Sequence, residues 1–154
     1  MTGRCILVVF TIASAAALLR VTAQTVTPPQ ITPSVMRATA REFYRWYYDE
    51  FPVAATDAGR HDGDGRLADY SPHARERRRA RVIGMLSELR DAGEAGWSVD
   101  DRADLELIRA NLNRYLFEDR VLRRPRRDPG VYVLECTNAI FSLLKKDYAP
   151  RAER

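Results

Sequence analysis

The sequence predicts an all-α protein, and two observations support this prediction. Helix-start signals such as Ser71-Pro72 and Asp128-Pro129 recur along the chain, and apolar residues at helical spacing follow them. There is also no convincing strand pattern. We expect about four main helices, at roughly 34–50, 72–92, 99–122 and 130–146. Together they would form an incomplete helical bundle, the N-terminal part of a larger helical fold.

The first 23 residues have the pattern of a secretory signal peptide. Arg4 precedes an apolar run at 6–19, and the small residues ahead of Gln24 indicate cleavage after Ala23. This run is too short to span a bilayer comfortably. We therefore expect an exported protein, periplasmic or extracellular, with no stable membrane span after cleavage. The alternative is an uncleaved anchor.

Cleavage would change both the charge and the cysteine content. It removes two arginines and no acid, so the formal net charge falls from +4 to +2. Such mild basicity gives little support to nucleic-acid binding, which we do not expect. Cys136 is left without a second cysteine, so the sequence predicts no internal disulfide in the exported chain.

Residues 24–33 are rich in Thr and Pro, which is typical of an extended tether, and the helical segment occupies 34–154. The predicted helix at 34–50 concentrates aromatic side chains on one broad face: Phe43, Tyr44, Trp46, Tyr47 and Tyr48. Core packing is one interpretation of this face, and a stacking surface for a ligand is the other. By angle Glu50 falls within the aromatic face, and we expect it to turn outward in the last turn of the helix, with Arg60 or Arg66 as a candidate partner.

Residues 60–70 are predicted to form a loop. Asp62-Gly63-Asp64-Gly65 resembles part of a calcium site but lacks the remaining ligands and the closing Glu. His61 with two aspartates makes a poor zinc set. Turn formation accounts better for the Asp-Gly pairs, so we expect no metal-binding residues here.

The helix at 72–92 carries Arg75, Arg78 and Arg79 in the same direction as its apolar stripe. Their side chains either extend to solvent or meet acids elsewhere. A short turn at 93–97 makes this helix antiparallel to the one at 99–122. Residues whose numbers sum to about 190 then lie side by side, which places Arg75 within one turn of Asp119. We therefore predict a structural Arg75–Asp119 ion pair.

The helix at 130–146 is apolar around most of its circumference, which is typical of the core helix of a larger structure. The three other predicted helices can cover one or two of its sides. From this mismatch we expect 34–154 to be the N-terminal segment of a larger domain, truncated at its C-terminus.

Four sequence phrases, in this order and spacing, resemble the bacterial family catalogued as domain of unknown function 885, whose members are large, often exported helical proteins. They span about residues 43–150 and read FYRWYYDEFPVAATDAGRHDGDGRLADYSP, SVDDRADLELIRANLNRYLFE, RRDPGVYV and LLKKDYAP. Known members look like zinc-dependent peptidases with a His/Glu motif late in a much longer chain, where it supplies metal ligands and a general base. The resemblance implies that the present segment forms a wall or lid of a substrate cleft.

That His/Glu motif does not occur in this sequence, whose histidines are His61 and His73. We therefore assign no catalytic, cofactor-binding or metal-binding residue, and zinc would belong to a full-length relative. The first hypothesis is an N-terminal helical fragment of an exported metallopeptidase-like protein, inactive alone. Its partners would be the missing C-terminal part and a peptide substrate. The alternative is a stand-alone, non-enzymatic helical module that binds a peptide or protein partner through its aromatic and arginine faces.

Overall fold

The all-α prediction is confirmed: every regular element that the structure describes is a helix. The computed structural model describes residues 31–90, 92–145, 147–150 and 152. The predicted cleavage site between Ala23 and Gln24, and most of the predicted tether, lie outside these residues. The elements are α1 (Pro33–Glu50), α2 (Pro52–Asp57), α3 (Pro72–Glu88), α4 (Val99–Phe117), η1 (Glu118–Leu122), α5 (Arg124–Arg127) and α6 (Gly130–Lys145).

The beginnings of α3 and α4 follow from their capping serines. The hydroxyl of Ser71 accepts a hydrogen bond from the Ala74 amide at 3.2 Å, and Pro72 occupies the first helical position. At α4, the hydroxyl of Ser98 accepts from the Asp101 amide at 3.1 Å. Each serine satisfies an amide that the first turn of its helix would otherwise leave unpaired.

Helix ends agree less closely with the prediction. α3 ends at Glu88, before the predicted end at residue 92. α4 ends at Phe117, and the chain continues to Leu122 as a π-helix, η1. This π-helix closes at Arg123, whose φ of 51° is left-handed and breaks the helical path. α5 is a single helical turn between η1 and α6.

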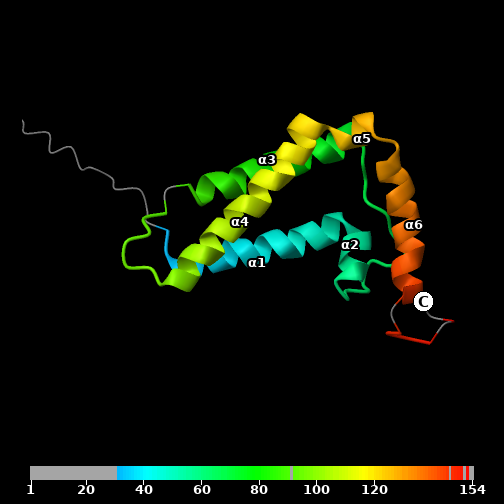
Figure 1. Ribbon diagram of the computed structural model, residues 1–154, viewed down its shortest axis with the longest axis horizontal. Coiled ribbons are helices and arrows are strands. Elements are labelled where there is room, and N and C mark those ends of the chain that lie inside the picture. Colours follow the sequence, from blue (N-terminus) through cyan, green and yellow to red (C-terminus); the bar gives the residue numbers. More distant parts are fainter. Residues whose placement is uncertain (1–30, 91, 146, 151, 153–154) are drawn as a thin grey trace, which may run out of the picture.

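The core lies among α1, α3 and α4, which run side by side in Figure 1. Its buried members come from all three helices: Met36, Phe43, Val82, Met85, Leu89, Leu105, Ile108 and Leu112. Burying each such side chain stabilises the fold by roughly 1.5–3 kcal/mol. Trp46, Tyr47 and Tyr115 pack at the edge of this cluster, so core packing explains part of the predicted aromatic face.

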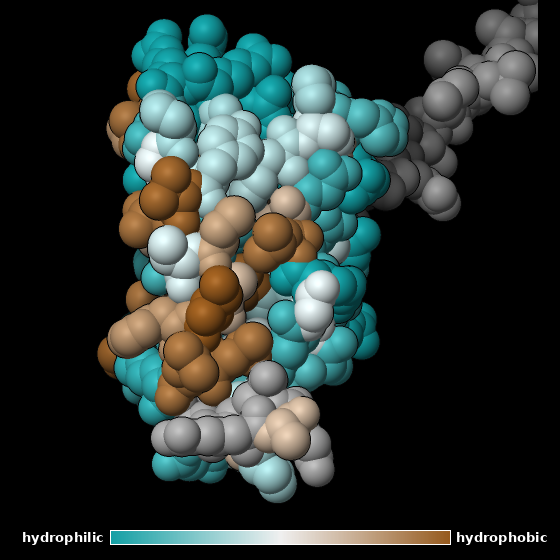
Figure 2. Space-filling model, turned by 90° about the vertical axis from the view of Figure 1, so that its right-hand side faces the viewer, coloured by the Kyte–Doolittle hydropathy of each residue, from teal (hydrophilic) through white to brown (hydrophobic). Residues whose placement is uncertain are grey.

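α6 stands apart from this core, across one end of the molecule, and packs mainly against α2 (Figure 1). Within the described part of α6, Ser142 alone is buried. Apolar side chains therefore gather on the surface at this end, which faces the viewer in Figure 2. None of the described helices combines the length and hydrophobicity needed to cross a membrane.

Candidate functional site

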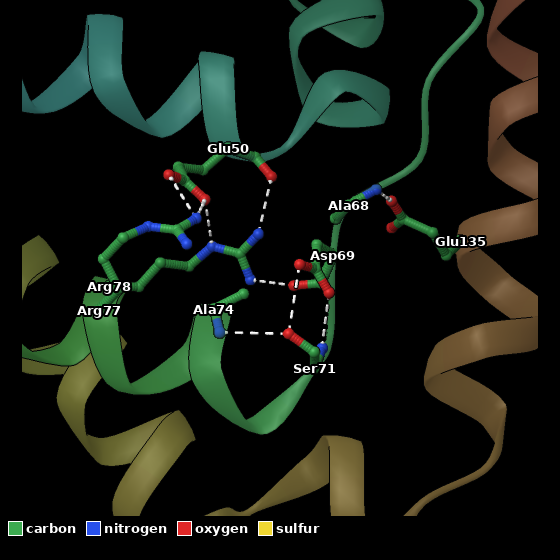
Figure 3. Close-up of polar contacts among 8 residues, drawn as sticks. All are labelled: Glu50, Ala68, Asp69, Ser71, Ala74, Arg77, Arg78 and Glu135. Atoms are coloured by element: carbon green, nitrogen blue, oxygen red, sulfur yellow. Dashed lines mark hydrogen bonds and ion pairs between the residues drawn. The ribbon is translucent and has the colours of Figure 1, made fainter.

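A buried arginine joins the end of α1 to the beginning of α3 (Figure 3). The Arg78 side chain is 2% exposed, and its Nε donates to the Glu50 carboxylate at 2.7 Å. Its two Nη atoms donate to the carbonyls of Asp69, at 2.6 Å, and Glu50, at 3.3 Å. The guanidinium also lies 4.7 Å from the ring centroid of Phe51. Four contacts thus compensate the buried charge and fix one wall of the neighbouring cleft.

The prediction that Arg60 or Arg66 pairs with Glu50 was wrong. Besides its bond to the buried arginine, Glu50 accepts hydrogen bonds from Arg77 Nη2 at 3.2 and 3.3 Å. Arg60 instead reaches Asp49 at 3.3 Å, and no ion pair joins Arg66 to Glu50 in the described structure. Proximity in sequence favoured the loop arginines, whereas packing brings the distant start of α3 against the end of α1.

Glu135 links α6 to the segment before α3. Its two carboxylate oxygens accept from the Ala68 amide at 3.1 Å and from the Tyr70 hydroxyl at 3.2 Å. Burial, together with the charge and hydrogen bond of Glu135, raises the pKa of Tyr70 well above its ordinary value. The hydroxyl therefore remains protonated at neutral pH and can donate this bond. The contact places α6 along the second wall of the cleft.

Between these walls lies a cleft of about 540 Å³ with mixed aromatic and charged sides. This volume is in the range of small-molecule sites. α1, the end of α4 and α6 supply its aromatic surface, which includes Phe43, Tyr47, Tyr115 and Phe141. α3, near its beginning, supplies Arg75 and Arg78. The aromatic face of α1 therefore contributes to a cleft as well as to the core.

Arg75 borders this cleft without an ion-pair partner in the described structure. The residue is 9% exposed, and its Nε is buried without a hydrogen-bond partner. No hydrogen bond or ion pair joins its guanidinium to another residue of the described chain. It also borders a second hollow, to which Asp119 contributes as well. The side chain is thus largely buried, and its Nη atoms, which are not among the fully buried atoms, remain accessible to solvent or to a ligand.

The predicted Arg75–Asp119 ion pair is not present. Asp119 pairs with Arg79, whose Nε donates to Asp119 Oδ2 at 2.6 Å. Hairpin register distinguishes partners only to within about one helical turn, and Arg75 and Arg79 are four residues, or one turn, apart on α3. Asp119 faces α3 as expected. It pairs with Arg79, one turn further along the helix, so Arg75 has no carboxylate partner.

Tyr47 and Tyr115 also border the cleft. Burial is the main cause that raises the pKa of Tyr47, and burial raises that of Tyr115 to about 12. Both phenols therefore stay protonated at neutral pH and can donate a hydrogen bond. Neither hydroxyl has a hydrogen-bond partner among the residues that the structure describes.

The predicted loop after α2 is organised around Asp64. Its carboxylate accepts from the hydroxyls of Thr56 at 2.6 Å and Tyr148 at 2.7 Å, and it pairs with His61 Nδ1 at 3.0 Å. The His61 and Tyr148 rings stack with centroids 3.4 Å apart. Asp64 thus connects the loop to the chain beyond α6, a contact between distant segments that no local sequence signal indicated.

The described residues include no cluster of three or more His, Cys, Asp or Glu side chains arranged to hold a metal ion. Comparisons with protein-family models, with curated proteins and with solved structures gave no match. Interpretation of the cleft therefore rests on its own geometry.

Proposed function

We propose that this chain is the N-terminal helical part of an exported metallopeptidase-like protein, without catalytic or metal-binding residues of its own. The sequence resemblance, which covers about residues 43–150, supports the proposal. In this view the chain contributes a wall of the substrate cleft, and the remainder of the protein supplies any zinc and the catalytic groups.

The exposed surface of α6 is the observation that carries this proposal. Val133, Ile140 and Leu144 are 62%, 64% and 70% exposed, and they are accompanied by half-exposed Leu134 and Phe141. Leaving such side chains in water forgoes roughly 1.5–3 kcal/mol for each one that a partner would bury. Contiguous apolar surface of this kind is typical of an interface. The partner we propose for it is the helical remainder of the same protein.

The length of the native protein tests this proposal directly. Antibodies against residues 33–145 would be used to probe an immunoblot of the source cells. We expect a band far larger than the 17.6 kDa of this chain. A native band at or just below 17.6 kDa would overturn the proposal. N-terminal sequencing of the exported form should begin at Gln24, and retention of Met1 would contradict the signal-peptide assignment.

The behaviour of the isolated chain provides a second test. We expect it to bind a hydrophobic dye and to self-associate, because the described residues leave the apolar side chains of α6 exposed. Replacing Val133, Ile140 and Leu144 by Gln should abolish both effects. Leu107→Gln is the control, since Leu107 on α4 is a single apolar residue with a similar exposure of 62%. A monomeric wild type that does not bind the dye would argue against an uncovered interface.

The second candidate function is a stand-alone helical module that binds a peptide or protein partner. The aromatic cleft with its uncompensated Arg75 favours this alternative. The immunoblot separates the two proposals, because a stand-alone module has the length of this chain and a fragment comes from a longer protein.

A further inference from the structure

Arg75 differs from the other arginines that border the cleft. Arg78 is held by Glu50, and Arg114 donates to Glu118 at 3.3 Å. Arg75 has no such partner in the described structure although it is 9% exposed. The buried Nε has no hydrogen bond and no acid neutralises the guanidinium, so an anion that enters the cleft would gain a strong and preorganised contact.

We propose that the cleft binds a small organic acid, whose carboxylate is held by Arg75 and whose apolar body packs on the aromatic wall. A planar guanidinium matches a carboxylate and can donate two parallel hydrogen bonds to it. Tyr47 and Tyr115 line the same space, and their protonated hydroxyls are further donors for a ligand. The cleft therefore contains hydrogen-bond donors, the Arg75 guanidinium and the two tyrosine hydroxyls, that have no acceptor among the described residues.

The rest of the cleft restricts the class of acid. Tyr47 and Phe51, which are half-buried, line the cleft with aromatic rings, and this favours a ligand with an aromatic or aliphatic body. Glu118 and Asp119 border the same cleft, so a doubly charged phosphate would meet stronger repulsion than a singly charged carboxylate. The volume of about 540 Å³ is sufficient for a ligand of the size of an acylated amino acid.

The site does not depend on the proposed function, since it concerns contacts within this chain. Equilibrium dialysis of the full chain with N-benzoylglycine tests it, with the uncharged amide of the same compound as the matched ligand control. A peptide C-terminus offers the same carboxylate, so the tripeptide Ala-Ala-Phe is dialysed in parallel to distinguish a free acid from a peptide. Inorganic phosphate is the competitor that tests the charge class.

Three variants connect binding to the guanidinium. Arg75→Met removes the charge and keeps a long apolar side chain, whereas Arg75→Lys keeps the charge and loses the planar fork. Arg41→Met is the control for net charge, because Arg41 is exposed on α1 and does not border the cleft. Circular dichroism verifies the fold of each variant.

We expect the wild type to bind N-benzoylglycine or the tripeptide, and to bind the amide at least tenfold more weakly. Arg75→Met should weaken binding tenfold or more, Arg75→Lys should weaken it severalfold, and Arg41→Met should remain within twofold of the wild type. If Arg75→Met does not fold, Arg75→Lys decides. The site is refuted if neither acid binds, or if the acid and its amide bind equally. It is also refuted if Arg75→Met, or Arg75→Lys where Arg75→Met does not fold, binds like the wild type. Tighter binding of phosphate than of the two acids would refute it as well.

Discussion

Replacing Arg78 with Met removes a buried cation from the junction of α1 and α3. The change keeps an unbranched apolar side chain but deletes the hydrogen bonds to the Glu50 carboxylate and to two backbone carbonyls. Glu50, whose side chain is 18% exposed, then retains Arg77 as its cationic partner. The perturbation therefore removes one member of a largely buried pair without leaving the acid wholly uncompensated.

The expected loss can be estimated from these contacts. Removing one member of a buried ion pair costs roughly 3–5 kcal/mol, mainly because the other member is left without compensation. Arg77 still meets Glu50, which favours the lower end of this range, whereas the Asp69 carbonyl loses its short contact of 2.6 Å. We therefore expect Arg78→Met to lower the free energy of unfolding by about 3 kcal/mol.

Arg81→Met is a matched control on the same helix. Arg81 also meets a glutamate of α1, Glu42 at 2.6 Å, and also lies over an aromatic ring, but both charged side chains are nearly half exposed. Exposed pairs contribute roughly 0–1 kcal/mol. Urea denaturation followed by circular dichroism at low micromolar concentration measures both variants. An Arg78→Met loss no greater than that of Arg81→Met would refute the view that burial makes this junction important.

Three further outcomes are expected. Gly84→Ala, at an exposed position of α3 where a Cβ meets nothing within 4 Å, should raise the unfolding free energy by roughly 0.5–1 kcal/mol, and a lower Tm would contradict this. A hydrogen bond from the serine that caps α4 is the main cause that keeps the pKa of Asp101 below 3.8. Its stabilisation is present above the unfolded-state pKa and is lost as pH falls through the lower folded-state pKa, so Asp101→Asn should flatten the stability profile below about pH 4; an unchanged slope would argue against it. Double-mutant cycles should give Arg79→Met with Asp119→Asn a larger coupling than Arg75→Met with Asp119→Asn, and equal couplings would contradict the observed pairing.

Local signals predicted most of the helices. Ser71-Pro72 and Ser98 begin helices through contacts with residues at most three positions away. Such helix starts can therefore be predicted from the local sequence alone. The change to a π-helix after Phe117 has no comparable local signal. Its position depends on how the end of α4 meets its neighbours, and the prediction therefore extended the α-helix to residue 122.

The candidate site was predicted in part. The inward direction of Arg75, Arg78 and Arg79 follows from helical periodicity, and the buried positions of the first two agree with it. The identity of each partner depends on the crossing of distant helices to within one turn, which periodicity does not determine. Glu50 and Asp119 consequently form ion pairs with other arginines than the predicted ones.

The attachment of α6 has a consequence for the order in which the molecule opens. α6 contacts the rest of the molecule chiefly through α2 and the hydrogen bonds of Glu135. By contrast, α4 contributes Leu105, Ile108 and Leu112 to the buried core. Segments with few buried apolar contacts open without global unfolding. Amide hydrogens of α6 should therefore exchange with solvent well before those of α4, and Glu135→Gln should accelerate exchange in α6 while leaving α4 unchanged.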